Sequence, residues 1–120
     1  MRAFELASKE KMISAMAADM PEQINRTLAA CARQLDAIEE IDVETADGKV
    51  VLEFENGVKI IVSRQSATNQ IWVAEPGGGW RFDWKDGGWR SEKLAAPLPE
   101  FLSGLVSLQL GTPVHLSADM

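Results

Sequence analysis

Carboxylates are the side chains of this 120-residue chain whose spacing best suits metal chemistry. Eight of them lie between residues 36 and 55, against the single base Lys49: Asp36, Glu39, Glu40, Asp42, Glu44, Asp47, Glu53 and Glu55. Hard carboxylate oxygens suit Ca²⁺, Mn²⁺, Fe²⁺ or Fe³⁺. Asp42 and Glu44 are two residues apart on an expected strand, which separates their attachment points by about 6.6 Å. This spacing predicts a weak, exposed site; the alternative is a solvated acidic edge that guards against aggregation.

Tryptophans form a second cluster in the sequence, after the carboxylates. All four lie in residues 69–89, NQIWVAEPGGGWRFDWKDGGW, and the chain has no tyrosine. Side chains alternate between the two faces of a strand, so Trp80, Phe82 and Trp84 share one face while Trp72 belongs to the other. We expect Trp80 and Trp84 in the core. We expect Trp72 on the exposed face, where a tryptophan among polar residues is typical of a protein-binding hot spot, unless a loop or the N-terminal segment covers it.

Composition excludes several classes of function. One cysteine and one histidine exclude an intramolecular disulfide, a Cys/His zinc site and a protein-held iron–sulfur cluster. No catalytic set is visible: Cys31 falls among apolar residues and is expected in the core, and His115 is expected in a surface strand. The net charge of −6 disfavours nucleic acid as a partner and favours cations or a basic protein surface.

The sequence also predicts a location. No apolar run approaches the roughly 20 residues that a membrane span needs. The N-terminal segment MRAFELASKEKM has neither the apolar region of a signal peptide nor the acid-poor composition of a transit peptide. We therefore expect no membrane association and a cytoplasmic protein.

Two helices must flank the residues that carry the chemistry. Apolar side chains recur at helical spacing from Ile24 to Ile38, after a Pro21 that suits the first position of a helix, and predict about four amphipathic turns. Residues 97–111 predict a second helix that ends at Gly111. Its apolar face is expected to carry Phe101, Leu102, Leu105, Val106 and Leu108.

The segment between the helices predicts about five to six strands. Turn signals such as Asp47-Gly48 and Asp86-Gly87 recur at short intervals, which indicates an antiparallel meander and an α+β two-layer sandwich with both helices on one face. The helices should cover Val50, Leu52 and Phe54 of one strand and Val58, Ile60 and Val62 of the next. The opposite, outward face should then carry Asp42, Glu44, Val51, Glu53, Lys59, Ile61, Gln70, Trp72 and Arg81.

The run LEFENGVKIIVSRQSATNQIWVA, followed by GGGWRFDW and GGW, resembles the frataxin family, including its bacterial CyaY branch. The matching features are the FENG hairpin, the KIIVSRQ strand, the TNQIWVA segment and RFDW. The resemblance extends over residues 41–89 and more loosely over the helix on either side. It implies a frataxin-like domain at residues 21–120, preceded by residues 1–20 as an extension or helix of uncertain role.

Frataxins bind iron weakly on an acidic ridge and dock on the cysteine desulfurase and scaffold protein that build iron–sulfur clusters. The resemblance therefore implies an Fe²⁺/Fe³⁺ site on Asp36, Glu39, Glu40, Asp42 and Glu44. It also implies a docking face that comprises Gln65, Asn69, Gln70, Trp72 and Arg81. The chain departs from the family in its first helix, where residues 27–35 contain no acid, and this implies fewer or weaker iron sites.

Two functions stay open. One is an iron-binding adaptor or regulator of iron–sulfur cluster assembly, monomeric and without catalysis, in a bacterial cytoplasm. Family members have been credited with ferroxidase activity, for which the residues give no separate support. The alternative is a small ligand- or carbohydrate-binding module, in which Trp72 stacks on a sugar and the acidic edge only maintains solubility.

Overall fold

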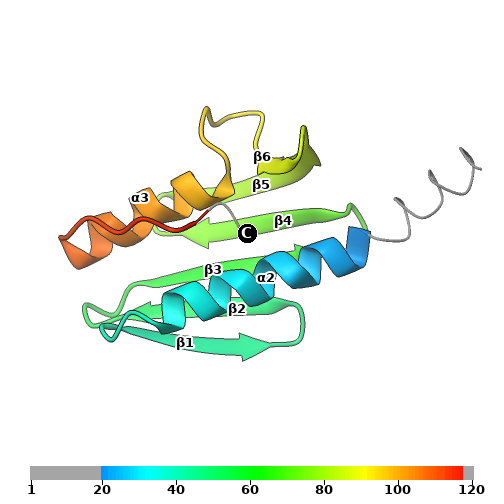
Figure 1. The fold of residues 1–120 in the computed structure, drawn as a ribbon. Helices are drawn as coiled ribbons and strands as arrows, with labels where there is room; N and C mark the ends of the chain where they lie inside the picture. The colour runs from blue at the N-terminus through cyan, green and yellow to red at the C-terminus, as the bar shows by residue number, and fades with distance from the viewer. Residues whose placement is uncertain (1–19, 118–120) are drawn as a thin grey trace, which may run out of the picture.

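The computed structural model describes residues 20–117 as two helices and one six-stranded antiparallel sheet, which confirms the predicted α+β fold (Figure 1). The strands lie side by side in chain order, from β1 at one edge to β6 at the other. Apart from Met20, the predicted N-terminal extension lies outside the described residues. The elements are α2 (Met20–Asp36), β1 (Ile41–Ala46), β2 (Lys49–Phe54), β3 (Lys59–Gln65), β4 (Gln70–Glu75), β5 (Gly78–Lys85), β6 (Gly88–Arg90) and α3 (Leu98–Leu110).

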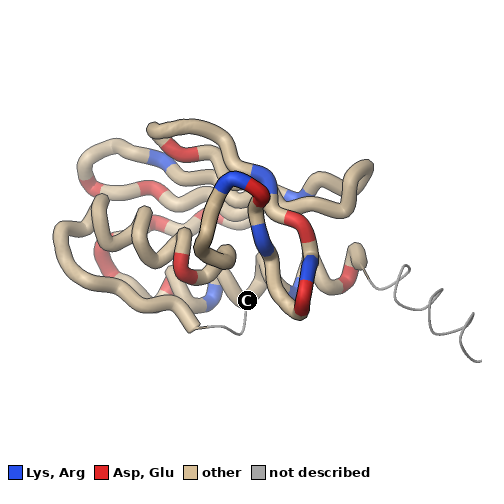
Figure 2. The backbone as a smooth tube through the Cα atoms, turned by 90° about the horizontal axis from the view of Figure 1, so that it is seen from above, with Lys and Arg blue, Asp and Glu red and all other residues tan. Residues whose placement is uncertain are grey.

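Both helices cover the same face of the sheet. In Figure 1, α2 runs across β1, β2 and β3, and α3 lies over β4 and β5; Figure 2 shows the helical segments together on one side of the strands. Ile24, Leu28, Cys31 and Leu35 form the buried stripe of α2. Burial raises the pKa of the Cys31 thiol to about 12, in accord with its predicted place in the core. No helix within residues 20–117 has the length and apolarity that crossing a membrane requires.

Short turns keep the strands in register. Only two residues separate β1 from β2, β4 from β5, and β5 from β6. Asp86 and Gly87 both have positive φ, 53° and 75°, as the favoured two-residue hairpin requires. Val50 faces Val62 across the β2–β3 pair, and both are buried, whereas Glu53 faces Lys59 on the opposite side of the sheet. The predicted division into inward and outward residues is therefore confirmed.

Trp89 is the tryptophan at the centre of the core, with 1% of its surface exposed. Its indole N–H donates to the Thr27 hydroxyl at 2.9 Å, and that hydroxyl donates to the Gln23 carbonyl at 3.0 Å. Trp80 is half-buried and packs its ring against Phe101 at a centroid distance of 5.6 Å, close to the prediction.

The prediction that Trp84 lies in the core is wrong. Trp84 is on the helix-facing side, opposite Trp89 in the β5–β6 pair, and stacks edge-on against Trp89 at 5.3 Å. Its exposed fraction is nevertheless 37%, because β5 extends beyond the part that α3 covers (Figure 1). Alternation identified the face but not the end of the helical layer.

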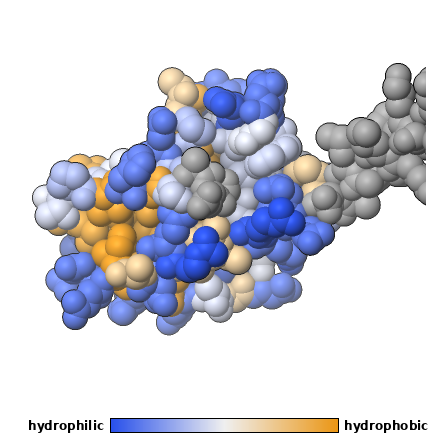
Figure 3. Space-filling view, viewed as in Figure 1, coloured by the Kyte–Doolittle hydropathy of each residue, from blue (hydrophilic) through white to orange (hydrophobic). Residues whose placement is uncertain are grey.

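Leu108 also differs from its prediction. It is 76% exposed, whereas Leu102 and Val106 of the same helix are buried. Leu98, Leu102 and Val106 recur at a spacing of four, and Leu108, two residues after Val106, lies on the opposite side of the helix, away from the sheet. Figure 3 shows an apolar surface over the C-terminal end of α3.

The C-terminal tail packs on the helices without forming a strand, so the predicted surface strand at His115 is wrong, although His115 is exposed. Serine hydroxyls replace the backbone partners that a strand would supply. Ser107 accepts from the Val114 amide at 2.8 Å, and Ser103 accepts from the Leu116 amide at 2.9 Å. Leu116 is buried as a result.

The different burial of the two stacked tryptophans predicts different stabilities for their variants. Trp89→Ala should lower the free energy of unfolding by about 3–5 kcal/mol, because it opens a cavity and leaves Thr27 without its donor. Trp84→Ala should cost about 1 kcal/mol, in the range of partly exposed positions. Urea unfolding of both variants measures this difference. Equal losses of unfolding free energy would contradict the difference in burial between Trp89 and Trp84.

Candidate functional site

The outward face of the sheet carries most of the predicted site residues, and neither helix covers it. Residues that face each other across neighbouring strands form rows on this face. One row is Asp42, Glu53 and Lys59. A second row, nearer the centre of the sheet, contains Ser63, Trp72 and Arg81. The face is therefore acidic at its β1 end and aromatic and basic toward β5.

The acidic edge, defined as Asp36, Glu39, Glu40, Asp42 and Glu44, follows the end of α2 into the edge strand β1. All five residues are exposed. Asp42 and Glu44 point outward from β1, opposite Glu53 and Val51 of β2. The three other residues lie at the last position of α2 and in the turn that follows it, where the Ile38 and Ile41 amides donate to the carbonyls of Leu35 and Ile38.

No preformed cage exists at this edge. Within residues 20–117, no three or more acidic, histidine or cysteine side chains are placed to hold a metal ion together. A cation would therefore gather exposed carboxylates that lie on the surface of a strand and a turn, and losing water at each contact would limit its affinity. This geometry favours weak rather than tight binding of a cation.

Three of the eight acids lie outside the predicted metal set, Asp47, Glu53 and Glu55, and the structure brings Glu53 next to that set. Its side chain faces Asp42 directly across the β1–β2 pair, and Glu44 follows two residues along β1 on the same face of the sheet. The two-residue turn at Asp47 and Gly48 sets this register, so hairpin geometry was the signal that could have found it.

Trp72 is held in a defined orientation on the outward face. Its indole N–H donates to the Gln70 side-chain carbonyl at 2.9 Å, and the Gln70 amide group donates to Asp83 at 3.0 Å. The Arg81 guanidinium lies 4.8 Å from the centre of the Trp72 ring, within cation–π distance. The ring is half-buried and flanked by these polar groups, and neither helix of residues 20–117 covers it; the N-terminal segment, which the sequence analysis named as a possible cover, lies outside the described residues. The structure thus brings Gln70, Trp72 and Arg81 together.

The two other predicted docking residues lie next to this group. Gln65 faces Gln70 at the end of the β3–β4 pair and donates to the Ser63 hydroxyl at 3.4 Å. Asn69 is exposed in the β3–β4 turn with φ of +53°, a conformation that asparagine tolerates better than most residues. Together these five residues, defined as the docking face, line one end of β3, β4 and β5.

Comparison with known proteins relates this sequence to one family. Residues 8–112 match the model of the frataxin-like domain. The iron-sulfur cluster assembly protein CyaY of Tolumonas auensis is 46% identical over 77 residues, which cover 64% of this chain and 74% of that protein. The protein of the same name from Paraburkholderia phytofirmans is 39% identical over 92 residues, 76% of this chain and 88% of that protein.

Solved structures share the fold. Frataxin from Psychromonas ingrahamii superposes with a TM-score of 0.76 at 22% identity, covering 83% of this chain and 96% of that one. Trimeric frataxin from the yeast Saccharomyces cerevisiae, in its ferrous-complexed form, superposes with a TM-score of 0.60 at 26% identity, covering 78% of this chain and 87% of that one.

The opposition of Asp42 and Glu53 predicts that the acidic edge costs stability. Like charges directly opposite each other on paired strands repel, so Asp42→Lys should raise the free energy of unfolding by about 0.2–1 kcal/mol at low salt. The gain should shrink as salt screens it. Glu55→Lys, the same charge change beyond the end of the β1–β2 register, is the control. Urea unfolding at two salt concentrations measures both; equal effects would show that only net charge matters.

Proposed function

The chain belongs to the frataxin family, and we propose that it acts in iron–sulfur cluster assembly as a weakly iron-binding adaptor or regulator. Relatives named iron-sulfur cluster assembly protein support this role. The observation that carries it is the sheet face that neither helix covers, on which an oriented Trp72 and the Asp42 and Glu44 carboxylates of the acidic edge lie together. Binding, rather than covalent catalysis, fits Cys31, whose thiol is buried in the core and has its pKa raised by that burial.

Iron is proposed as a cargo of the acidic edge, bound through exposed carboxylates alone. The ferrous-complexed yeast frataxin supports iron as the metal. Exposed sites that are held together by charge lose affinity as the salt concentration rises. Weak and reversible binding suits a protein that passes a metal on or senses its supply.

Docking is proposed to use the face around Trp72, with the cysteine desulfurase and scaffold protein of cluster assembly as partners. Large aromatic side chains and arginine dominate the energy of protein interfaces. Trp72 and Arg81 combine both, and their mutual contact already fixes their rotamers, which reduces the entropy lost on binding. We propose that the monomer is the docking form and that it acts in a bacterial cytoplasm.

The iron proposal predicts which amide signals a paramagnetic metal ion broadens. Mn²⁺, added as a paramagnetic substitute for Fe²⁺, should broaden the amide signals of residues 36–44 and of Glu53, with a dissociation constant in the micromolar range or weaker. Combined Asp42→Asn and Glu44→Gln substitution should lower the apparent affinity severalfold, because each removes one anionic ligand. Glu55→Gln is the matched control. Broadening centred on His115, or spread evenly, would contradict the proposal.

The docking proposal predicts opposite effects on binding and stability. Trp72→Ala should weaken binding to a purified desulfurase–scaffold complex by about 2 kcal/mol or more, near thirtyfold, and Arg81→Ala should weaken it too. Trp72→Ala should cost under about 1 kcal/mol of folding stability, because the ring lies outside the core. Calorimetric titration and urea unfolding measure the two quantities.

Trp84→Ala is the matched control for docking, since it also removes a partly exposed tryptophan but from the helix-facing side. It should bind as the parent protein does. An unchanged affinity for Trp72→Ala together with a lower affinity for Trp84→Ala would contradict the proposal, because it would place the partner on the helix-facing side. Binding of Trp72 to glycans, without any desulfurase or scaffold, would instead support the carbohydrate-binding alternative.

A further inference from the structure

The sheet has an open edge in its second half, beside β5. Strand β6 is only three residues long and pairs with Asp83, Trp84 and Lys85. Residues 78–82 of β5 pair with β4 on one side and, among the described residues, with no strand on the other. Such an edge presents backbone N–H and C=O groups to any chain that can align with it.

The register shows which residues present those groups. Lys85 and Gly88 flank a two-residue hairpin loop, so they are a hydrogen-bonded pair and Lys85 turns its backbone toward β6. Backbone groups alternate along a strand, so Asp83, Arg81 and Gly79 turn theirs the same way. For Gly79 and Arg81 that direction is the open edge. Gly79 is exposed and has no side chain, and a Cβ built on it meets nothing within 4 Å, so even an alanine there would leave the edge open.

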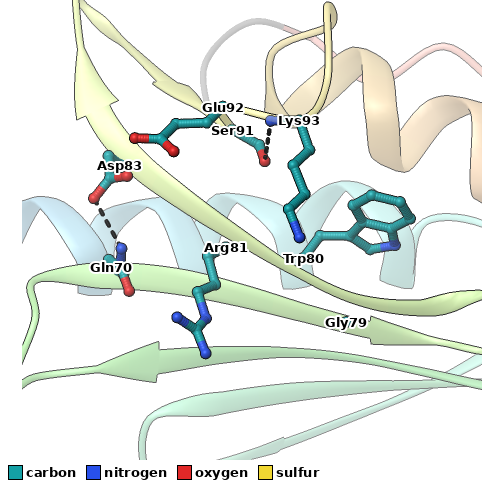
Figure 4. A pocket seen from close by; sticks show the side chains of 8 residues that line it. All are labelled: Gln70, Gly79, Trp80, Arg81, Asp83, Ser91, Glu92 and Lys93. Atoms are coloured by element: carbon teal, nitrogen blue, oxygen red, sulfur yellow. Dashed lines mark hydrogen bonds between the residues drawn. The ribbon is translucent and has the colours of Figure 1, made fainter.

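A cavity of about 400 Å³ occupies the space beside this edge (Figure 4). Gly79, Trp80, Arg81 and Asp83 of β5 line one side, and Ser91, Glu92 and Lys93, which follow β6, line the other. In Figure 4 the Lys93 side chain extends across from the loop toward Trp80. The cavity therefore has a backbone edge as one wall and a charged loop as the opposite wall.

The charge around the cavity is opposite to that of the chain. A second cavity adjoins the first and shares Asp83, Ser91 and Glu92 with it. Their combined lining has four cations, Arg81, Lys85, Arg90 and Lys93, against the carboxylates of Asp83 and Glu92, whereas the whole chain has a net charge of −6. Within residues 20–117, none of the four cations forms an ion pair. Arg81 lies against the Trp72 ring, and the charges of Lys85, Arg90 and Lys93 remain available to a ligand.

We propose that the open edge of β5 binds a short, acidic, extended segment of a partner protein as an added strand. The added strand aligns with Gly79 and Arg81, its backbone pairs with theirs, and its carboxylates lie near Arg81 and Lys93. Strand addition of this kind takes its affinity from main-chain hydrogen bonds and its selectivity from side chains on either flank. The five residues 78–82 limit the paired segment to about five residues.

Charge and space select this occupant. The other edge of the sheet, β1, carries Asp42 and Glu44 and repels an acidic strand, so only the β5 edge attracts one. A second copy of the chain has an acidic β1 strand, but that strand brings the rest of its sheet with it. The loop at 91–93 stands across a cavity of about 400 Å³ from β5, a space too small for a second sheet.

The probe is the peptide acetyl-Glu-Val-Glu-Val-Glu-amide, followed by amide NMR signals of the full chain. The peptide should bind with a dissociation constant below about 1 mM and shift the signals of Gly79, Arg81 and Lys93. At about 90% occupancy, hydrogen exchange at the Gly79 and Arg81 amides should slow about tenfold, because exchange then comes from the free fraction. The Lys-for-Glu version of the peptide should leave these signals unchanged.

Two matched pairs of variants separate the backbone contribution from the charge contribution. Gly79→Pro removes the N–H that faces the open edge and should abolish binding, while Gly79→Ala keeps the N–H and should bind as the parent does. Lys93→Glu should weaken binding about fivefold, while Lys59→Glu, the same charge change on β3, should not. If Gly79→Pro fails to fold, the comparison of Lys93→Glu with Lys59→Glu still tests the proposal.

Three results would overturn the proposal. The first is no shift up to several times the expected dissociation constant, and the second is equal binding of the acidic and basic peptides. The third is a set of shifts centred on Trp72 instead of Gly79, which would place the peptide on the docking face. Self-association that Lys93→Glu disrupts without any peptide, seen by sedimentation, would assign the edge to a second copy and overturn the proposal as well.

Discussion

Both helices pack on the same face of the sheet, and most other features of the molecule depend on this one-sided coverage. A strand alternates its side chains between two faces, so one set along β2, β3 and β4 must be apolar and meets the helices. Neither helix of residues 20–117 covers the other set. That face can then carry a row such as Ser63, Trp72 and Arg81 without cost to the core.

The hydrogen bond between Trp89 and Thr27 ties the last strand into this arrangement. It joins residues 62 positions apart, and it satisfies an indole N–H that would otherwise be buried without a partner. Trp89 is the central residue of β6, so the bond holds a strand of only three residues beneath the helices. After Arg90 the chain leaves the sheet toward α3. The open edge of β5 is thus a consequence of how the core is closed.

Alternation and two-residue turns were sufficient to predict the fold and the faces. The outward positions of Asp42, Trp72 and Arg81 followed from the strand period, because a shift by one residue would have buried charges. Coverage could not be predicted in the same way. Trp84 and Leu108 have apolar side chains at positions with the right period, yet the end of a layer and the rotation of a helix decide their exposure. Those are tertiary facts that no local pattern contains.

The site residues divide along the same line. Strand positions such as Asp42 and Gln70 could be placed from the sequence, but the contacts that orient Trp72 could not, since the Gln70–Asp83 hydrogen bond joins side chains from different strands. The cluster of cations near β5 could not be predicted from the sequence. Its members are scattered over thirteen residues and balanced by nearby acids: Arg81, Lys85, Arg90 and Lys93. Only the hairpin and the loop at 91–96 bring them to one place.

The two edges of the sheet carry opposite charge, and this separation links the proposed metal site to partner selection. A cation held by Asp42 and Glu44 would cancel charge within a Debye length of about 8–10 Å, which covers β1 and β2 but not β5, several strands away at about 4.8 Å per strand. Metal occupancy would therefore weaken the attraction of a basic surface to β1 while the surroundings of Trp72 and Lys93 stay unchanged. The same sheet can respond to metal at one edge and hold its partners at the other.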